Sequence, residues 1–196
     1  MSIRKKVRLA VADYVFAKKI KDFRHTHKMV SIEDAKKIGI LYDATNEKNY
    51  EVVTQYLRFL RSKQKEVKTL GFVDKKQLPK NQFAKLGIDF FTKKHLDWKM
   101  IPKHPLVNNF INENFDILIN LSIEKCFPLQ YIAAVSKAKF RVGRYEMGYT
   151  NYYDLMINIE SKSTLKNFIQ QIDHYLNLIK PKIPFEINTL NTSINL

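Results

Sequence analysis

A nearly unbroken run of apolar side chains at residues 115–122 constrains the fold of this chain more than any other segment. In the sequence FDILINLS, apolar residues fill most positions and do not alternate with polar ones. Strands with one face in water alternate between apolar and polar residues, whereas strands buried on both faces are apolar almost throughout. The run therefore predicts a strand inside a parallel sheet that is covered by helices on both sides.

Apolar runs and helical periodicities alternate along the chain in the order that such a sheet requires. Because parallel strands need a crossover between them, this alternation predicts an α/β fold, a single Rossmann-like three-layer domain with a mostly parallel sheet. We place the domain at residues 31–180, with a polar tail at residues 181–196. Five further strands are expected at residues 37–43, 67–73, 88–92, 140–143 and 155–159, and helices at residues 47–64, 105–114, 129–136 and 164–179.

Residues 1–30 are predicted to form a long basic helix that precedes this domain. From residue 2 to residue 28 there is no Gly or Pro, and nine Lys and Arg side chains stand against two Asp. The apolar side chains of this stretch change from one helical face to the other midway. Such a helix can pack first on a partner and then on its own domain, it can kink around residues 13–15, or both of its halves can lie on its own domain.

Positive charge is concentrated in the first half of the chain. Residues 1–104 carry 25 of the 34 Lys and Arg side chains but 11 of the 19 Asp and Glu side chains, and so account for nearly all of the net charge of +15. A cationic surface attracts polyanions over roughly a Debye length, ~8 Å at physiological salt. The chain has more Lys than Arg and no recognisable module for reading bases. This composition favours recognition of the backbone and shape of a nucleic acid over recognition of its sequence. We therefore predict a non-catalytic protein that binds structured RNA, in the ribosome or its precursors.

The predicted RNA contacts come from the basic helix and from the basic stretch that follows it. Lysine and arginine contact phosphates, and an exposed aromatic side chain can stack on an unpaired base. Trp98 is the best aromatic candidate, whereas Phe90 and Phe91 are assigned to the core, and the five histidines are expected to extend the basic surface. The predicted contact residues are Arg4, Lys5, Lys6, Arg8, Lys18, Lys19, Lys21, Arg24, Arg58, Arg61, Lys93, Lys94, Trp98 and Lys99.

A small-molecule site is expected in the crevice beyond the carboxyl ends of the strands. The turn at residues 42–47 has no glycine, so we expect no dinucleotide cofactor, and the absence of a P-loop argues against a nucleoside triphosphatase of that kind. The pair His25 and His27 has no Cys partner, and the chain has no His-Glu-x-x-His motif, so we expect no bound metal. The alternative function is a small transferase or hydrolase acting on a nucleotide or sugar-phosphate, with Asp43, Asn120 and Ser122 as its polar groups. The competing structural role for Asp43 is a turn residue bonded to backbone amides.

The single cysteine, Cys126, fits a reducing compartment, because one thiol excludes an intramolecular disulfide framework. Its neighbour Lys125 could lower the thiol pKa, but an inert thiol is expected. No apolar stretch approaches the ~20 residues of a membrane-spanning helix, and Asp13 interrupts the apolar part of the basic N-terminus, unlike a signal peptide. We expect a cytoplasmic protein. A third alternative is an adaptor whose N-terminal helix docks on a protein or an anionic membrane.

Two resemblances point to the same fold. Residues 115–122 and residues 128–143, PLQYIAAVSKAKFRVG, are similar to the strand–helix–strand unit in the first domain of heptosyltransferase-like glycosyltransferases. In that family a second Rossmann domain holds most of the sugar nucleotide, and this chain has no room for one, so the resemblance implies a fold and no catalytic residue. The whole chain also resembles an uncharacterised family of small basic bacterial Rossmann-like proteins, which implies no function.

Overall fold

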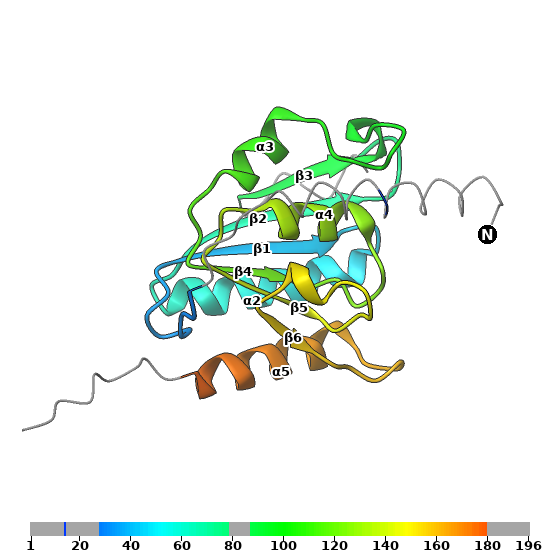
Figure 1. The fold of residues 1–196 in the computed structure, drawn as a ribbon. Coiled ribbons are helices and arrows are strands. Elements are labelled where there is room, and N and C mark those ends of the chain that lie inside the picture. The colour runs from blue at the N-terminus through cyan, green and yellow to red at the C-terminus, as the bar shows by residue number, and fades with distance from the viewer. Residues whose placement is uncertain (1–13, 15–27, 79–86, 180–196) are drawn as a thin grey trace, which may run out of the picture.

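Six parallel strands form the centre of the fold (Figure 1). The computed structural model describes residue 14 and residues 28–78 and 87–179, and in it the strand order is β3-β2-β1-β4-β5-β6. Every neighbouring pair is parallel, which confirms the predicted architecture, and the sheet is wholly parallel where a mostly parallel one was predicted. The strands are β1 (Lys37–Asp43), β2 (Glu66–Val73), β3 (Ile88–Thr92), β4 (Ile117–Asn120), β5 (Phe140–Arg144) and β6 (Leu155–Ile157).

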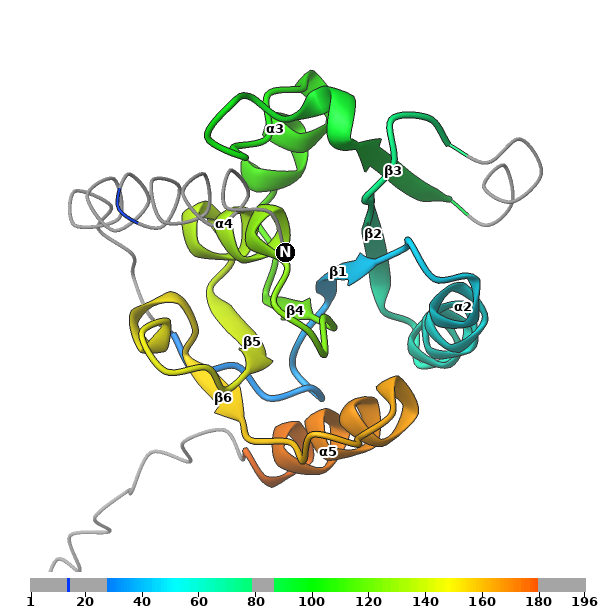
Figure 2. The ribbon, with the colours of Figure 1, turned by 90° about the vertical axis from the view of Figure 1, so that its right-hand side faces the viewer.

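Helices cover both faces of the sheet, as the alternation predicts. In Figure 2, α2 and α5 lie on one face, and α3 and α4 lie on the other. All carboxyl ends of the strands meet at one edge because the strands are parallel. The helices are α2 (Glu47–Ser62), α3 (Pro105–Ile111), α4 (Phe127–Val135) and α5 (Leu165–Leu178), with short 3-10 helices η1 (Lys93–His95) and η2 (Thr150–Tyr152).

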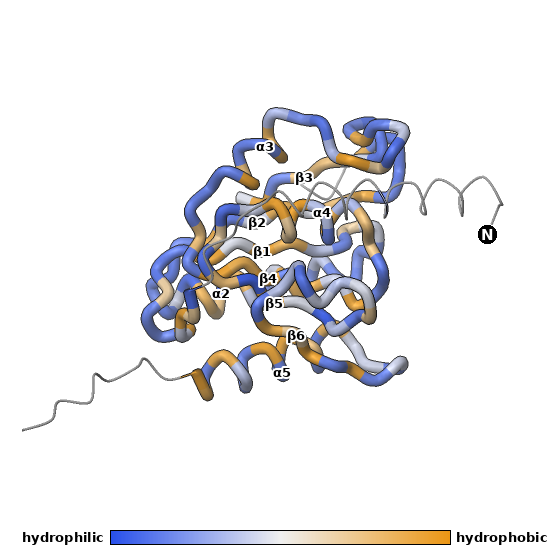
Figure 3. Tube along the Cα trace, in the orientation of Figure 1, coloured by the Kyte–Doolittle hydropathy of each residue, from blue (hydrophilic) through white to orange (hydrophobic). Residues whose placement is uncertain are grey.

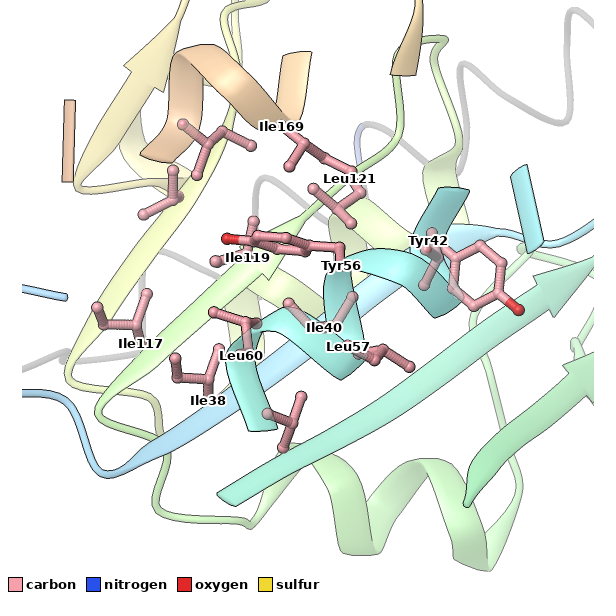
Figure 4. Packing of buried hydrophobic residues seen from close by; sticks show 14 of the residues in the cluster. Ile38, Ile40, Tyr42, Tyr56, Leu57, Leu60, Ile117, Ile119, Leu121 and Ile169 are labelled. Carbon is pink, nitrogen blue, oxygen red and sulfur yellow. The ribbon is translucent and has the colours of Figure 1, made fainter. Parts of the chain in front are cut away.

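The core has two parts because the central strands send side chains to both faces. On β1, Ile38 and Ile40 face α2 and α5, whereas Leu41 belongs to the cluster under α3 and α4. Figure 4 shows the first cluster, in which these isoleucines meet Tyr56 and Leu57 of α2. The same division explains the apolar strand sequences, and Figure 3 shows hydrophobic colours along the strands with hydrophilic colours in the loops beyond them.

Local sequence signals determine where the two helices of the first face begin. The side chain of Asn46 accepts a hydrogen bond from the backbone N–H of Lys48 at the start of α2, and Thr164 accepts from Asn167 at the start of α5. Each cap satisfies one of the backbone donors that a helix leaves unpaired in its first turn. Between the two helices, Tyr56 donates a 2.7 Å hydrogen bond to Asp173.

A buried ion pair joins the two strands at the β6 side of the sheet. Oδ2 of Asp154 accepts hydrogen bonds from the backbone N–H of Arg141 at 2.7 Å and from its Nε at 3.2 Å. The guanidinium also donates to the carbonyl of Ala134 at 3.1 Å. Because both charged side chains are almost fully buried, with 3% and 5% of their surface exposed, each depends on the other for its stability.

Candidate functional site

A cleft lies where the strand order reverses direction. From β1 the chain continues to β2 on one side of the sheet, while β4 pairs with the other side of β1, and this is the switch point at which ligands enter open α/β sheets. The cleft between the loops that follow β1 and β4 has a volume of ≈ 630 Å³. Its lining residues are Asp43, Thr45, Asn46, Glu47, Lys48, Asn49, Leu121, Ser122, Ile123 and Glu124. We call it the switch-point cleft.

Asp43 is both a turn residue and part of this cleft. Its Oδ1 accepts a hydrogen bond from the backbone N–H of Thr45 at 2.8 Å, and its carbonyl accepts from Nδ2 of Asn49 at 3.0 Å. The expected structural role is therefore confirmed. Within the described part of the chain, no donor contacts Oδ2, so one carboxylate oxygen keeps its capacity to accept a hydrogen bond.

Asn120 and Ser122, the other two predicted polar groups, form a buried network. Ser122 donates from Oγ to Oδ1 of Asn120 at 2.9 Å, and Nδ2 of Asn120 donates to the hydroxyl of Tyr153 at 2.7 Å. Ser122 lines the cleft, whereas Asn120 lies behind it. The structure thus brings Asp43 and Ser122 to one cleft and gives Asn120 a positioning role.

The cleft is acidic although the protein is basic. Its lining includes the carboxylates of Asp43, Glu47 and Glu124 and the ammonium of Lys48. The N-terminus of α2, which would otherwise suit an anion, is capped by Asn46 and carries Glu47 in its first turn. This arrangement favours hydrogen-bond donors over phosphates as ligands.

A second candidate site lies beside the cleft, beyond the carboxyl ends of β2 and β3. The backbone N–H of Lys93 donates to the carbonyl of Lys75 at 3.1 Å, which joins the segment after β2 to the segment after β3. Within the described residues 74–78 and 92–103, Asp74 and Asp97 are the acidic side chains that oppose the lysines. We define the β2–β3 basic surface as Lys75, Lys76, Lys93, Lys94, Trp98, Lys99 and Lys103.

Trp98 stands at the tip of a tight turn on this surface. Oδ1 of Asp97 accepts hydrogen bonds from the backbone N–H groups of Lys99 at 2.8 Å and Ile101 at 3.0 Å. Met100 completes the turn with a φ of 64°, an uncommon conformation for a residue with a side chain. Trp98 is 65% exposed, as expected, and Nζ of Lys99 lies 5.2 Å from the centre of its ring. The turn holds an aromatic face beside cations.

Three features lower the positive charge of this surface. Lys93 forms an ion pair with Asp74 at 2.8 Å, and Lys103 forms one with Asp97 at 3.5 Å. The expectation that the histidines add charge is wrong for His95, whose Nδ1 accepts from the backbone N–H of Thr92 at 3.1 Å. Burial, helped by His104 and Lys94, lowers the pKa of His95 below its ordinary value, so this ring is neutral at neutral pH.

Arg58 and Arg61 do not join the β2–β3 basic surface. Both lie in the second half of α2, which ends at Ser62 and leads directly into the amino end of β2 at Glu66. The predicted residues Lys93, Lys94, Trp98 and Lys99 follow the carboxyl end of β3 instead. At about 3.3 Å per residue, the length of β2 separates the two groups by roughly 25 Å.

The other predicted RNA contacts lie outside the described residues, together with His25 and His27. They are Arg4, Lys5, Lys6, Arg8, Lys18, Lys19, Lys21 and Arg24.

Cys126 begins α4 and has the properties of an inert thiol. Burial raises the pKa of the thiol, and the nearby carboxylates of Asp43 and Asp74 act in the same direction. The idea that Lys125 lowers this pKa is wrong, because Nζ of Lys125 lies 4.7 Å from the ring centre of Tyr149 and 4.0 Å from Glu146.

The described residues contain neither a cluster of metal ligands nor a helix that could span a membrane. In residues 28–78 and 87–179, no group of three or more His, Cys, Asp or Glu side chains is arranged to hold a metal ion. None of the helices in these ranges combines the length and the apolar character needed to cross a bilayer.

Four contributors to these sites are not among the predicted site residues: Lys75, Lys76, Lys103 and Tyr153. Lys75 and Lys76 lie in the basic stretch just after β2, so the strand-end rule that applies to Lys93 applies to them too. Tyr153 lies 33 residues from its partner Asn120, and no local pattern links the two.

Comparison with known proteins places the chain in a family. Neither the curated proteins nor the solved structures contain a match. A family model described as "Family of unknown function (DUF6913)" matches residues 10–179, which include all of the strands and the cleft. The protein with this basic surface and acidic cleft therefore belongs to the family of unknown function DUF6913.

Proposed function

We propose that the protein binds structured RNA through the β2–β3 basic surface. The observation that carries this proposal is Trp98, an exposed aromatic ring that a hydrogen-bonded turn holds among lysines. Stacking on unpaired bases and contact with phosphates are two of the interactions by which proteins hold single-stranded loops of RNA. Both need rigid, exposed groups of these kinds.

A rigid platform suits this task better than a mobile one. The segment that carries Trp98 is closed by a bridge between Leu96 and Pro102 and by a 2.7 Å hydrogen bond from the N–H of Lys103 to the carbonyl of His95. A stacking ring that is already positioned loses little conformational entropy when a base binds. The lysines around it supply the sequence-independent attraction.

Charge reversal at two matched places tests the proposal. Lys75→Glu combined with Lys94→Glu alters the β2–β3 basic surface, and Arg58→Glu combined with Arg61→Glu makes the same change in net charge on α2. The probe is a fluorescent RNA hairpin with an unpaired loop, followed by anisotropy. We expect the lysine pair to weaken binding far more than the arginine pair. Equal effects, or no binding by the native protein, would refute the proposal.

The ribosome is the partner that we propose for this surface. Lysate from cells that express the protein is sedimented through sucrose at low and high salt, with and without ribonuclease. Migration with ribosomal particles that is sensitive to both treatments supports this partner. Migration as a free protein under all conditions argues against it.

A second candidate function rests on the switch-point cleft, which brings Asp43 and Ser122 together. A small transferase or hydrolase would use these groups, in line with the local resemblance to heptosyltransferase-like enzymes. The acidic lining disfavours a phosphorylated substrate. The adaptor alternative depends on residues 1–30, which lie largely outside the described residues.

A further inference from the structure

The switch-point cleft is built to accept hydrogen bonds. Oδ2 of Asp43 has no donor among the described residues, and the Ser122 hydroxyl has spare lone pairs after it donates to Asn120. Asn120 is itself held by Tyr153, so Ser122 is fixed in place by a network rather than by its own loop alone. Fixed acceptors of this kind select ligands that carry hydroxyl or amino groups.

The charge of the cleft excludes one class of ligand. Three carboxylates and one lysine line a volume of ≈ 630 Å³, which is within the usual range for small-ligand sites. A phosphate inside this space would face like charges, and the capped N-terminus of α2 offers it no compensation. A neutral group with several hydroxyls is not repelled by the carboxylates and does not need a free helix N-terminus. Leu121 and Ile123 provide apolar contacts for its carbon atoms.

The cleft and the β2–β3 basic surface are neighbours. Oγ1 of Thr45, in the cleft lining, accepts a 2.9 Å hydrogen bond from the N–H of Asp74, and Asp74 pairs with Lys93 of the basic surface. The hydrogen bond between Thr45 and Asp74 and the ion pair between Asp74 and Lys93 therefore connect the cleft to the basic surface.

We propose that the switch-point cleft binds the ribose of an RNA nucleotide whose flanking phosphates lie on the β2–β3 basic surface. Asp43 accepts a hydrogen bond from a ribose hydroxyl, in the way that a carboxylate at a strand end recognises ribose in dinucleotide-binding folds. The 2′-hydroxyl is the group that distinguishes RNA from DNA at a given position. This proposal rests on the proposed RNA function and adds discrimination against DNA to it.

The test compares an RNA hairpin with a DNA hairpin of the same sequence for three proteins. Asp43→Asn keeps an oxygen for the Thr45 N–H and replaces the other oxygen by a donor. Asp89→Asn makes the same charge change at an exposed position on β3, outside the cleft. We expect the native protein and Asp89→Asn to prefer RNA by about tenfold or more, the range for a hydrogen bond to a charged group. In Asp43→Asn this preference should fall to near one, through loss of RNA affinity.

The other outcomes of this comparison would refute either the ribose site or the proposed RNA-binding function. A preference for RNA that survives in Asp43→Asn would overturn the ribose site, and so would equal binding of RNA and DNA by the native protein, although the basic surface would still stand. Binding of neither hairpin would refute the proposed function itself. If Asp43→Asn does not fold, Ser122→Ala replaces it in the same comparison, because the backbone N–H of Ser122 still donates to Asn120.

Discussion

Trp98 is the side chain whose removal should affect RNA binding most without affecting the fold. Stacking of one base on an aromatic ring contributes about 1–3 kcal/mol, so Trp98→Ala should weaken binding of the RNA hairpin by that amount. Thermal unfolding should change little, because 65% of the surface of Trp98 is exposed. Tyr145→Ala serves as the control, since Tyr145 is 43% exposed and follows β5, away from the basic surface. Equal losses of affinity in both variants would contradict the role of Trp98.

His95 should make the stability of the protein depend on pH. Its folded pKa is lower than its ordinary value of 6.5, so the unfolded chain binds a proton more readily than the native protein does. The free energy of unfolding should therefore decrease as the pH falls through about 6.5 towards the folded pKa. Denaturation in urea at several pH values measures this. His95→Gln should flatten that part of the profile.

Arg141 should be far more important for stability than its surface counterpart Lys139. Arg141→Met removes the guanidinium that balances the buried carboxylate of Asp154, and removal of one partner from such a pair costs about 3–5 kcal/mol. Lys139→Met breaks a 2.7 Å pair with Asp116, but the lysine side chain is half exposed, so the cost should stay below about 1 kcal/mol. Chemical denaturation compares the two variants. A similar loss of stability in both variants would show that burial does not determine how much an ion pair contributes to the free energy of unfolding.

At the scale of the elements, Gly143 on β5 is required by the Tyr153 ring. A Cβ added at Gly143 would lie 2.5 Å from Cε1 of Tyr153. Gly143→Ala should therefore destabilise the protein by roughly 1–3 kcal/mol, the usual effect of overpacking. In a Tyr153→Leu background the cost should be smaller, because the crowded ring is gone. Denaturation measures the loss of stability in both backgrounds. Equal losses would show that Gly143→Ala does not act through crowding of the Tyr153 ring.

The elements themselves could be predicted from sequence because each one carries its own signal. Strands such as β4 are apolar on both faces, and α5 repeats apolar residues at helical spacing. The parallel order follows from the alternation of strands and helices. In the part that the structure describes, every predicted strand and helix is present, with ends that differ by a few residues.

The candidate sites were less predictable because they depend on which strand ends meet. Strand-end position correctly brought Asp43 and Ser122 to one cleft. Arg58 and Lys93 belong to the same basic stretch of the sequence, so they were predicted to lie on one surface. In the structure they lie at opposite ends of the sheet, because Arg58 is in the second half of α2 and Lys93 follows the carboxyl end of β3. The acidic character of the cleft could not be predicted from local sequence, because its carboxylates come from two loops more than 70 residues apart.

At the scale of the whole molecule, charge should govern how RNA binding depends on salt. If four to six phosphates are contacted, log affinity should fall with log salt at a slope of about −3 to −5. Replacing Lys75 and Lys94 by Glu should reduce the magnitude of the slope by about 2, one unit for each lost phosphate contact. Titration of the RNA hairpin at several salt concentrations measures both slopes. A flat dependence would exclude phosphate contacts as the main source of affinity.

The strand order also has a consequence for the protein while it is being made. β1 ends at Asp43 and pairs with β2 on one side, but its partner on the other side, β4, begins only at Ile117. At about 5–20 residues per second, a ribosome needs roughly 4–15 s to synthesise the intervening chain. For that time, a nascent sheet of the first three strands carries an open edge of backbone donors and acceptors beside buried isoleucines, and such an edge pairs readily with other chains. A chain truncated before residue 117 would keep this edge permanently.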